Sequence, residues 1–217
     1  MLRYIYGTDL HKFPLLRDTM FRDRAEQFSK RLGWDVKVDE FGFEKDEYDA
    51  LNPLYVIWEL PDGTHGGSMR FLPTSGRTMV NEHFSHLTDG VKIESPFIWE
   101  CTRFCLSPHA DRKVTAALVL GAGELMANFS LSHFIGVFDP RMERIYRLHG
   151  VIPDVIGKAG TGADAIGVGL WEMNEAAWPK TLKKVGVTRE HSLRWFRSAF
   201  GIKTRTTPAR AAVPEFA

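Results

Sequence analysis

The charged residues of this chain constrain its fold more than any other sequence feature. Between Arg22 and Asp49, arginines and carboxylates are mixed with aromatic residues too densely for an ordinary solvated helix face. Later apolar segments add Arg70, Glu100 and Arg103. Burying an ionic group costs several kcal/mol unless the group is paired. The pattern therefore predicts one internal charged site built from distant parts of the chain.

Length and composition favour a single domain. The chain has 217 residues, of which 44% are hydrophobic, and this is enough for a sizeable core. We expect one domain over residues 1–201 and a flexible C-terminal tail over 202–217, where Thr, Pro, Ala and Arg occur without periodicity. The formal net charge of +1 gives no reason to expect a nucleic-acid partner.

The sequence predicts neither a membrane span nor a metal site. No apolar run approaches the roughly 20 residues that cross a bilayer, and the first residues lack the pattern of a secretory signal, so we expect a cytoplasmic protein. Cys101 and Cys105 lie four residues apart, a spacing that suits neither a common zinc site nor an undistorted disulfide.

Hydrophobic periodicity predicts an α+β fold. Phe21, Ala25, Phe28 and Leu32 recur at helical spacing, and a polar loop over 35–52 follows them. The expected strands cover 2–6, 54–60, 67–72, 97–106, 131–138, 151–156 and 165–172, and the expected helices cover 13–32, 111–128, 140–148, 175–185 and 191–200. This order describes a three-layer α/β/α sandwich with helices on both faces of a sheet.

Four short segments carry a family signature. They are Arg24-x-x-x-Phe28-x-x-x-x-x-Trp34, Asp46-Glu-Tyr-Asp49, Gly67-Ser-Met-Arg70 and Trp99-Glu100-Cys-Thr-Arg103-Phe104. In order and spacing the chain resembles the acyl-homoserine-lactone synthases, the autoinducer synthases of quorum sensing. The resemblance implies a mixed sheet similar to that of the GNAT acetyltransferases. It also implies a cytoplasmic acyltransferase.

The resemblance also implies a reaction and its site residues. The acyl chain of an acyl carrier protein would be joined to S-adenosylmethionine, giving an N-acyl-homoserine lactone and methylthioadenosine, with no cofactor. Glu100, Arg103 and Arg70 would be catalytic. Residues expected to bind S-adenosylmethionine are Arg24, Phe28, Trp34, Asp46, Asp49 and Phe104.

The residue types agree with that chemistry. An amine that attacks a thioester must lose a proton, and a carboxylate in a partly desolvated site suits this task. Glu100 is the best candidate, although it could instead simply pair with Arg103 or Arg70. Strict alternation would send Glu100 and Arg103 to opposite faces of the sheet, so a shared site requires a β-bulge in their strand. We predict such a bulge.

Structural alternatives accompany the other candidates. Asp46, Asp49 and Glu100 would balance three arginines, but the two aspartates could also be solvated loop acids. Phe28 could be a core residue of its helix as easily as a ring that faces a sulfonium or adenine.

The acyl donor is the part of the reaction that the sequence determines least. The stretch 107–113 contains no glycine, unlike the phosphate-binding turns of enzymes that use acyl-CoA, and this favours a protein-bound donor. Carrier proteins are acidic, so Arg141, Arg144 and Arg147, with Lys158, could dock one, or could form an ordinary exposed basic face. A GNAT-like N-acyltransferase that uses acyl-CoA and another amine is the alternative reading.

The acyl chain is expected to be of medium to long length. Family members that prefer 3-oxo chains often carry a hydroxyl residue where this chain has Gly136, so unsubstituted or 3-hydroxy chains are favoured; Thr102 is a further candidate for contact with the acyl chain. Candidates for the wall of an acyl tunnel are Met79, Phe84, Leu118, Met126, Phe134, Val137, Leu148 and Trp171.

Overall fold

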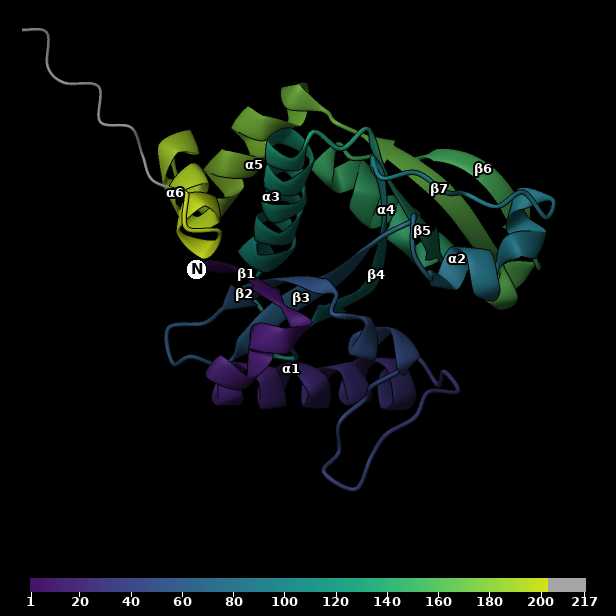
Figure 1. Ribbon diagram of the computed structural model, residues 1–217, viewed down its shortest axis with the longest axis horizontal. Coiled ribbons are helices and arrows are strands. Elements are labelled where there is room, and N and C mark those ends of the chain that lie inside the picture. Colours follow the sequence, from purple (N-terminus) through teal and green to yellow (C-terminus); the bar gives the residue numbers. More distant parts are fainter. Residues whose placement is uncertain (203–217) are drawn as a thin grey trace, which may run out of the picture.

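The computed structural model describes residues 1–202, which form an open seven-stranded mixed sheet with helices on both faces (Figure 1). The strand order is β1-β2-β3-β4-β5-β7-β6, and all neighbouring strands are antiparallel except β4 and β5. The strands are β1 (Leu2–Tyr6), β2 (Leu54–Glu59), β3 (His65–Pro73), β4 (Ile98–Leu106), β5 (His133–Phe138), β6 (Asp154–Ala159) and β7 (Ile166–Glu172).

The helices form the outer two layers. Helix α1 covers one face of the sheet, and α3, α5 and α6 cover the opposite face (Figure 1). The helices are α1 (Pro14–Ala25), α2 (Met79–Glu82), α3 (Arg112–Phe129), α4 (Pro140–His149), α5 (Trp178–Val185) and α6 (Arg189–Ala199). Helix α1 continues as a π-helix over Glu26–Arg31, and 3-10 turns occupy Gly7–Lys12, Glu47–Leu51, Ser85–Thr88, Gly162–Asp164 and Glu175–Ala177. The predicted α+β, GNAT-like three-layer architecture is confirmed.

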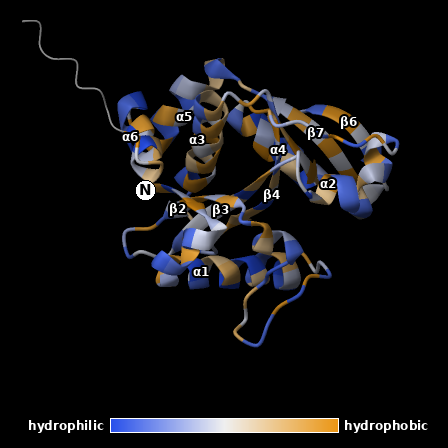
Figure 2. Cartoon of the chain, in the orientation of Figure 1, coloured by the Kyte–Doolittle hydropathy of each residue, from blue (hydrophilic) through white to orange (hydrophobic). Residues whose placement is uncertain are grey.

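Helix α3 is the central helix of the core. Its residues are mostly apolar, as Figure 2 shows, and Val114, Leu118 and Leu125 are fully buried. A Cβ at Gly121 would lie 2.6 Å from the side chain of Val56 on β2, so glycine lets this helix approach the sheet closely. The close approach fixes α3 against the sheet.

Local signals set the ends of α4. The side chain of Asp139 accepts a hydrogen bond from the backbone N–H of Arg141, and Pro140 occupies the first turn, where its missing N–H is harmless. Gly150 ends the helix at φ +70°. The helix thus begins one residue after the end of β5.

The predicted bulge in β4 is confirmed. Ser68 pairs with Cys105, but Arg70 pairs with Thr102, so β4 contains one more residue than β3 over this interval. Arg103 lies in the bulge with φ +53°, a conformation that residues other than glycine rarely adopt. Because of the extra residue, the side chains of Glu100 and Arg103 both reach the same cavity.

Strands β4 and β5 separate after a short parallel contact. Their register runs from Ile98 opposite His133 to Glu100 opposite Ile135 and is not continued along the rest of β4. The bulge lies just beyond this contact. The sheet therefore opens between its two halves, next to Glu100.

Two expectations about element bounds need comment. Strand β6 begins at Asp154, three residues later than predicted, because Val151 is bonded to other elements: its N–H donates to the carbonyl oxygen of Tyr146 on α4, and its carbonyl oxygen accepts from Trp171 Nε1 at 2.9 Å. The expected C-terminal tail, apart from Ile202, lies outside the described residues. Over residues 1–202, no helix combines the length and apolar character needed to cross a membrane.

Candidate active site

Arg24 anchors an internal ionic cluster. Its side chain projects from α1 and is 1% exposed. The Nε atom lies 2.6 Å from Glu44 Oε2, and the two terminal nitrogens each lie 2.9 Å from an oxygen of Asp49. This two-pronged pairing joins α1 to the segment that precedes β2.

Arg70, on β3, is the second cation of the cluster. Its Nη1 lies 2.5 Å from Asp46 Oδ1 and 2.9 Å from Asp49 Oδ1, and its Nη2 lies 2.9 Å from Asp46 Oδ2. Its Nε donates to the hydroxyl oxygen of Thr102 at 3.0 Å. Thr102 therefore helps to orient Arg70, a contact that the sequence did not predict.

Arg103 is the third cation, and its partners correct one expectation. Its Nη2 lies 2.8 Å from Asp46 Oδ2 and 3.0 Å from Glu44 Oε1. The third acid that balances the arginines is therefore Glu44, and the prediction that Glu100 fills this place is wrong. Glu44 became buried because its segment folds back on α1, where its backbone N–H donates to the carbonyl oxygen of Phe21. The loop has no hydrophobic periodicity from which the burial of Glu44 could have been predicted.

The ionisation states follow from this pairing. Burial alone would raise the pKa of Asp49, but Arg24, Arg70 and the hydroxyl of Tyr55 outweigh it and hold that pKa far below its ordinary value. Burial would lower the pKa of Arg24, but Asp49 and Glu44 raise it instead. The two aspartates are thus structural partners of arginines and are not freely solvated loop acids, with Asp46 also capping the 3-10 turn at Glu47.

Glu100 stands apart from the cluster. Its side chain is 1% exposed and accepts hydrogen bonds from the backbone N–H groups of Val80 (2.6 Å) and Met79 (3.1 Å) at the start of α2. The alternative in which Glu100 pairs with Arg70 or Arg103 is wrong, since the ion pairs of both arginines go to other acids. Burial raises the pKa of Glu100, although the two N–H groups partly offset this.

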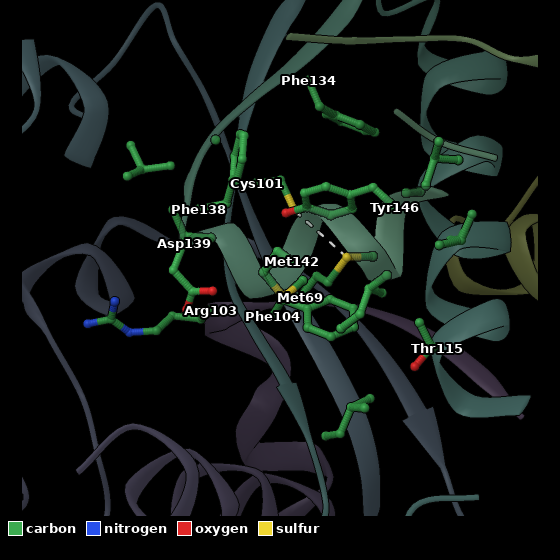
Figure 3. A pocket seen from close by; sticks show the side chains of 18 of the residues that line it. Met69, Cys101, Arg103, Phe104, Thr115, Phe134, Phe138, Asp139, Met142 and Tyr146 are labelled. Atoms are coloured by element: carbon green, nitrogen blue, oxygen red, sulfur yellow. Dashed lines mark hydrogen bonds between the residues drawn. The ribbon is translucent and has the colours of Figure 1, made fainter. Parts of the chain in front are cut away.

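A cavity of about 1270 Å³ passes through the opening between β4 and β5. Its wall combines residues from the α1 side of the sheet with residues of α3, α4 and α5 on the other side. Figure 3 shows the cavity from close by, with Met69, Phe104, Met142 and Tyr146 around it and with Arg103 and Asp139 also in its wall. The cavity thus connects the charged site to an apolar interior.

The predicted site residues fall into three groups. Those that line the cavity are Phe28, Trp34, Glu100, Thr102, Arg103, Phe104, Gly136 and Arg141. Arg24, Asp46, Asp49 and Arg70 belong to the ionic cluster that holds Arg103. Their proximity was predicted. In the structure they bind one another and Arg103, and of the three arginines of the cluster only Arg103 lines the cavity. The other three predicted residues, Arg144, Arg147 and Lys158, lie outside the wall at the surface.

The two predicted aromatic residues form a stack. The rings of Phe28 and Trp34 are 5.2 Å apart and inclined by 3°, and the Arg103 guanidinium lies 5.5 Å from the centre of the Phe28 ring. Phe28 is buried, whereas Trp34 is 43% exposed. The core interpretation of Phe28 and its interpretation as a site residue are therefore compatible, because this buried ring is also part of the wall.

Gly136 is a narrow point of the wall. A Cβ at this position would lie 2.8 Å from the carbonyl oxygen of Cys101 on β4. Any side chain here would have to push the two strands apart. Of the apolar wall candidates, all line the cavity except Leu118, which is packed in the core, and Leu148, which is 60% exposed.

Helix α4 supplies wall residues that the sequence analysis missed. Met142, Ile145, Tyr146 and His149 line the cavity. Their spacing of i, i+3, i+4 and i+7 is the pattern of one helix face, so this signal was present in the sequence. The analysis used the same helix only for its basic residues.

The basic residues of α4 are exposed, although Arg141 also borders the cavity. Arg141, Arg144 and Arg147 are exposed, as is Lys158 on β6. Arg141 pairs with Asp139, while Arg147 and Lys158 both lie within 3.6 Å of Glu143. The row exists as a surface feature, and its use as a docking face stays a prediction.

Chemically, the site combines a carboxylate and a cation at one cavity. Glu100 offers a buried carboxylate, and Arg103 offers a guanidinium whose position is fixed by Glu44 and Asp46. A proton-accepting carboxylate beside a long apolar cavity suits acyl transfer to an amine.

Comparisons with known proteins agree with this geometry. The family model described as autoinducer synthase matches residues 10–175. The chain is 40% identical over 180 residues to an acyl-homoserine-lactone synthase of Rhizobium etli, a match that covers 80% of this chain and 84% of the relative.

Solved structures show the same fold. The AHL synthase LasI superposes with a TM-score of 0.67 at 26% identity, covering 85% of this chain and 93% of LasI. The CoA-dependent acyl-homoserine lactone synthase BjaI, solved with SAM and isopentyl-CoA, has a TM-score of 0.76 at 19% identity, covering 86% and 90%.

The fold and the site therefore define an acyltransferase. The chain belongs to the autoinducer synthase family. It is an acyl-homoserine-lactone synthase.

Proposed function

We propose that this enzyme acylates the amine of S-adenosylmethionine with a medium to long acyl chain delivered as a thioester of acyl carrier protein, and that lactonisation follows. The observation that carries the proposal is the placement of Glu100 and Arg103 on one cavity, where β4 and β5 separate. The products would be an N-acyl-homoserine lactone and methylthioadenosine, and no cofactor is required.

In the first step the amine nitrogen attacks the thioester carbon. A C–N bond forms, the C–S bond breaks, and the carrier sulfur leaves as a thiolate. The proton lost by the amine passes to Glu100, directly or through one water, and then to the thiolate, so that the carrier is released as a thiol. The raised pKa of Glu100 brings its basicity closer to that of the group it must deprotonate.

In the second step the methionine carboxylate attacks the γ-carbon of its own chain. A C–O bond forms, and the C–S bond of the sulfonium breaks, so that sulfur leaves as a neutral thioether. This step needs no base, only a substrate folded into a near-attack shape. Arg103 would hold the carboxylate, and its pairing with Glu44 and Asp46 keeps its side chain in place.

S-adenosylmethionine would occupy the cavity beside Phe28, Trp34 and Phe104. A sulfonium over an aromatic ring gains about 0.5–2 kcal/mol. Trp34 has a partly exposed ring available for this contact. The rest of the ionic cluster would hold Arg103 and the segment before β2 in place without touching the substrate; its members are Arg24, Arg70, Asp46 and Asp49.

Carrier protein is the first candidate for the donor. Arg141 lines the cavity and begins the exposed row that includes Arg144 and Arg147, and acidic carrier proteins suit such a surface. Coenzyme A is the second candidate, because BjaI is described as CoA-dependent and shares the fold. The absence of glycine over residues 107–113 favours the carrier.

The experiment compares the two donors with purified enzyme. Octanoyl carrier protein and octanoyl-CoA are each mixed with S-adenosylmethionine, and methylthioadenosine release and lactone formation are measured together. We expect a higher kcat/KM with the carrier thioester. Arg144→Glu should raise KM for the carrier and leave KM for octanoyl-CoA unchanged, whereas Lys92→Glu, at an exposed position outside the cavity wall, should change neither.

Two outcomes would contradict the proposal. Equal or better turnover of octanoyl-CoA would reverse the choice of donor. Acyl transfer to S-adenosylmethionine without release of methylthioadenosine would remove the lactone-forming step and favour an ordinary N-acyltransferase.

A further inference from the structure

Tyr146 of α4 brings to the cavity a hydroxyl group that the proposed reaction does not use. The residue is partly buried and lines the cavity, and its hydroxyl forms no hydrogen bond within residues 1–202. The fully buried side-chain atoms that lack a partner in this part of the chain are Tyr4 Oη, Thr78 Oγ1 and His149 Nδ1. The Tyr146 hydroxyl is not among them, so it has accessible surface.

Aromatic neighbours hold the ring of Tyr146 in place. It meets Trp171 of β7 edge to face, with ring centres 5.1 Å apart and planes inclined by 74°, and it meets Phe138 of β5 at 5.5 Å and 87°. Figure 3 shows the ring reaching from α4 toward Cys101 on β4. The hydroxyl at the tip of this ring is thus directed into the cavity, where a ligand can reach it.

Contacts around Gly136 place this hydroxyl at the opening between β4 and β5. The paired register of the two strands ends at Glu100, so Cys101 and Gly136 are the next residues on either side of the opening. A Cβ at Gly136 would lie 2.8 Å from the carbonyl oxygen of Cys101 and 3.4 Å from the Trp171 ring. Tyr146 packs on that same ring and points toward that same cysteine. It therefore borders the opening from the α4 side.

The direction of side chains along β4 indicates which part of the acyl chain meets Tyr146. Successive strand residues point to opposite faces of a sheet. Glu100 is accordingly bonded to α2, whereas Cys101 packs against the core cluster that contains α3. A chain whose thioester carbon lies at Glu100, and which enters the apolar interior through the opening, passes Cys101 and Tyr146 with its first carbons. The third carbon is only two bonds beyond the thioester carbon.

The hydroxyl of Tyr146 stays protonated and can donate. Burial raises the pKa of Tyr146 far above its ordinary value, and Cys101 and Asp139 act in the same direction. A protonated phenol donates a hydrogen bond to a keto oxygen, and it can donate to or accept from a hydroxyl group. An unsubstituted chain offers no such partner and would cover the hydroxyl without one, which is unfavourable.

We propose that Tyr146 is a specificity-determining residue whose hydroxyl binds an oxygen on the third carbon of the acyl chain, as a 3-oxo or a 3-hydroxyl group. The proposal rests on the proposed function, because it assumes that the acyl chain passes from Glu100 into this cavity. A 3-oxo group would then find a donor on α4 even though Gly136 has no side chain to supply one. The enzyme would prefer 3-substituted chains to unsubstituted chains of the same length.

The test compares donors that differ only in one oxygen. Octanoyl, 3-hydroxyoctanoyl, 3-oxooctanoyl and 5-hydroxyoctanoyl thioesters of acyl carrier protein are assayed by release of methylthioadenosine. Wild type should have a higher kcat/KM for the two 3-substituted donors than for the octanoyl donor, and the 5-hydroxylated donor should have no such advantage. Tyr146→Phe keeps the ring and should lower the preference for 3-substituted donors about fivefold to tenfold.

Tyr6→Phe is the matched control. Tyr6 is also partly buried and packs against an aromatic ring, but it lies outside the wall of the cavity, so its substitution should leave every ratio unchanged. An equal loss for all four donors in Tyr146→Phe would assign the hydroxyl to the thioester group itself and overturn the proposal. An unchanged ratio would also overturn it, as would the same loss of preference with the 5-hydroxylated donor.

A binding measurement tests the contact without turnover. Tyrosine is labelled with 13C at the ring carbon that bears the hydroxyl, and the Tyr146 resonance is assigned by its loss in Tyr146→Phe. N-(3-oxooctanoyl)-homoserine lactone should shift this resonance, and N-octanoyl-homoserine lactone should shift it much less. Equal shifts, or none with either lactone, would overturn the proposal. If wild type turned over none of the four donors, the proposed function itself would fail, and the role of Tyr146 with it.

Discussion

Arg103 Nη2 lies 3.0 Å from Glu44 Oε1, in an ion pair that joins the bulge of β4 to the loop folded against α1. Glu44 is fully buried and also binds Arg24, so one carboxylate holds a structural arginine and a cavity-facing one. The position of Arg103 at the cavity therefore depends on the fold of a loop more than fifty residues away in sequence.

Glu44→Gln should destabilise the protein strongly. Removing one member of a buried ion pair leaves its partner uncompensated, and such changes cost about 3–5 kcal/mol. Chemical denaturation monitored by tryptophan fluorescence would measure the loss. Glu26→Gln, which removes an exposed pair with Lys30, is the matched control and should change stability by less than about 0.5 kcal/mol. Equal effects would show that the cluster is not energetically special.

Glu100→Gln should keep the fold and lose activity. The replacement retains an oxygen that can accept from the N–H of Val80, but it cannot take a proton, and general-base catalysis contributes about 100-fold to 10,000-fold. Release of methylthioadenosine measures turnover, and the unfolding midpoint serves as the control. Retention of full activity by a correctly folded variant would rule out Glu100 as the base.

The pH dependence of kcat/KM should show the ionisation of Glu100. Glu100 acts as a base only when ionised, and burial raises its pKa, so kcat/KM should fall as the pH decreases through that raised value. The effect on stability has the opposite direction, because the fold favours the protonated form and loses stability as the pH rises through the same window. The acid limb of the profile should be absent from the residual activity of Glu100→Gln. An identical limb in the variant would assign it to another group.

The backbone of the bulge can be tested by two substitutions at one position. Arg103 has φ +53°, which glycine adopts freely and alanine does not. Both Arg103→Gly and Arg103→Ala should abolish most activity because they remove the guanidinium, but the glycine variant should be more stable by about 1 kcal/mol. Thermal unfolding compares the two. A more stable alanine variant would mean that the bulge relaxes when the side chain is removed.

Gly136→Ala should disturb the contact between the two halves of the sheet. Its added methyl group would lie 2.8 Å from a backbone oxygen of β4, so the strands must move, at a cost of about 1–3 kcal/mol. Loss of stability should be accompanied by lower activity with long chains. Gly76→Ala, at an exposed glycine without positive φ where the added Cβ would lie 3.7 Å from its nearest neighbour, controls for the loss of a glycine. A fully stable Gly136→Ala would show that β5 adjusts without strain.

Much of the fold could be predicted because its signals are local. The apolar spacing of α1, the Asp139-Pro140 start of α4 and the apolar length of α3 each follow from neighbouring residues, and each element was found near its predicted bounds. Even the bulge was predictable, since Glu100 and Arg103 could share a site only if alternation failed between them.

The sequence by itself determined the family, the α+β architecture, and most of the charged and aromatic residues from which the site is made, with Glu44 as the exception. Only the tertiary structure decided which acid pairs with which arginine. In the structure, Glu44 is the third acid of the ionic cluster, whereas Glu100 accepts hydrogen bonds from the N–H groups at the start of α2. The physical reason is that pairing depends on distances of a few ångströms between segments brought together by folding, whereas a linear sequence specifies only the charges that must find partners.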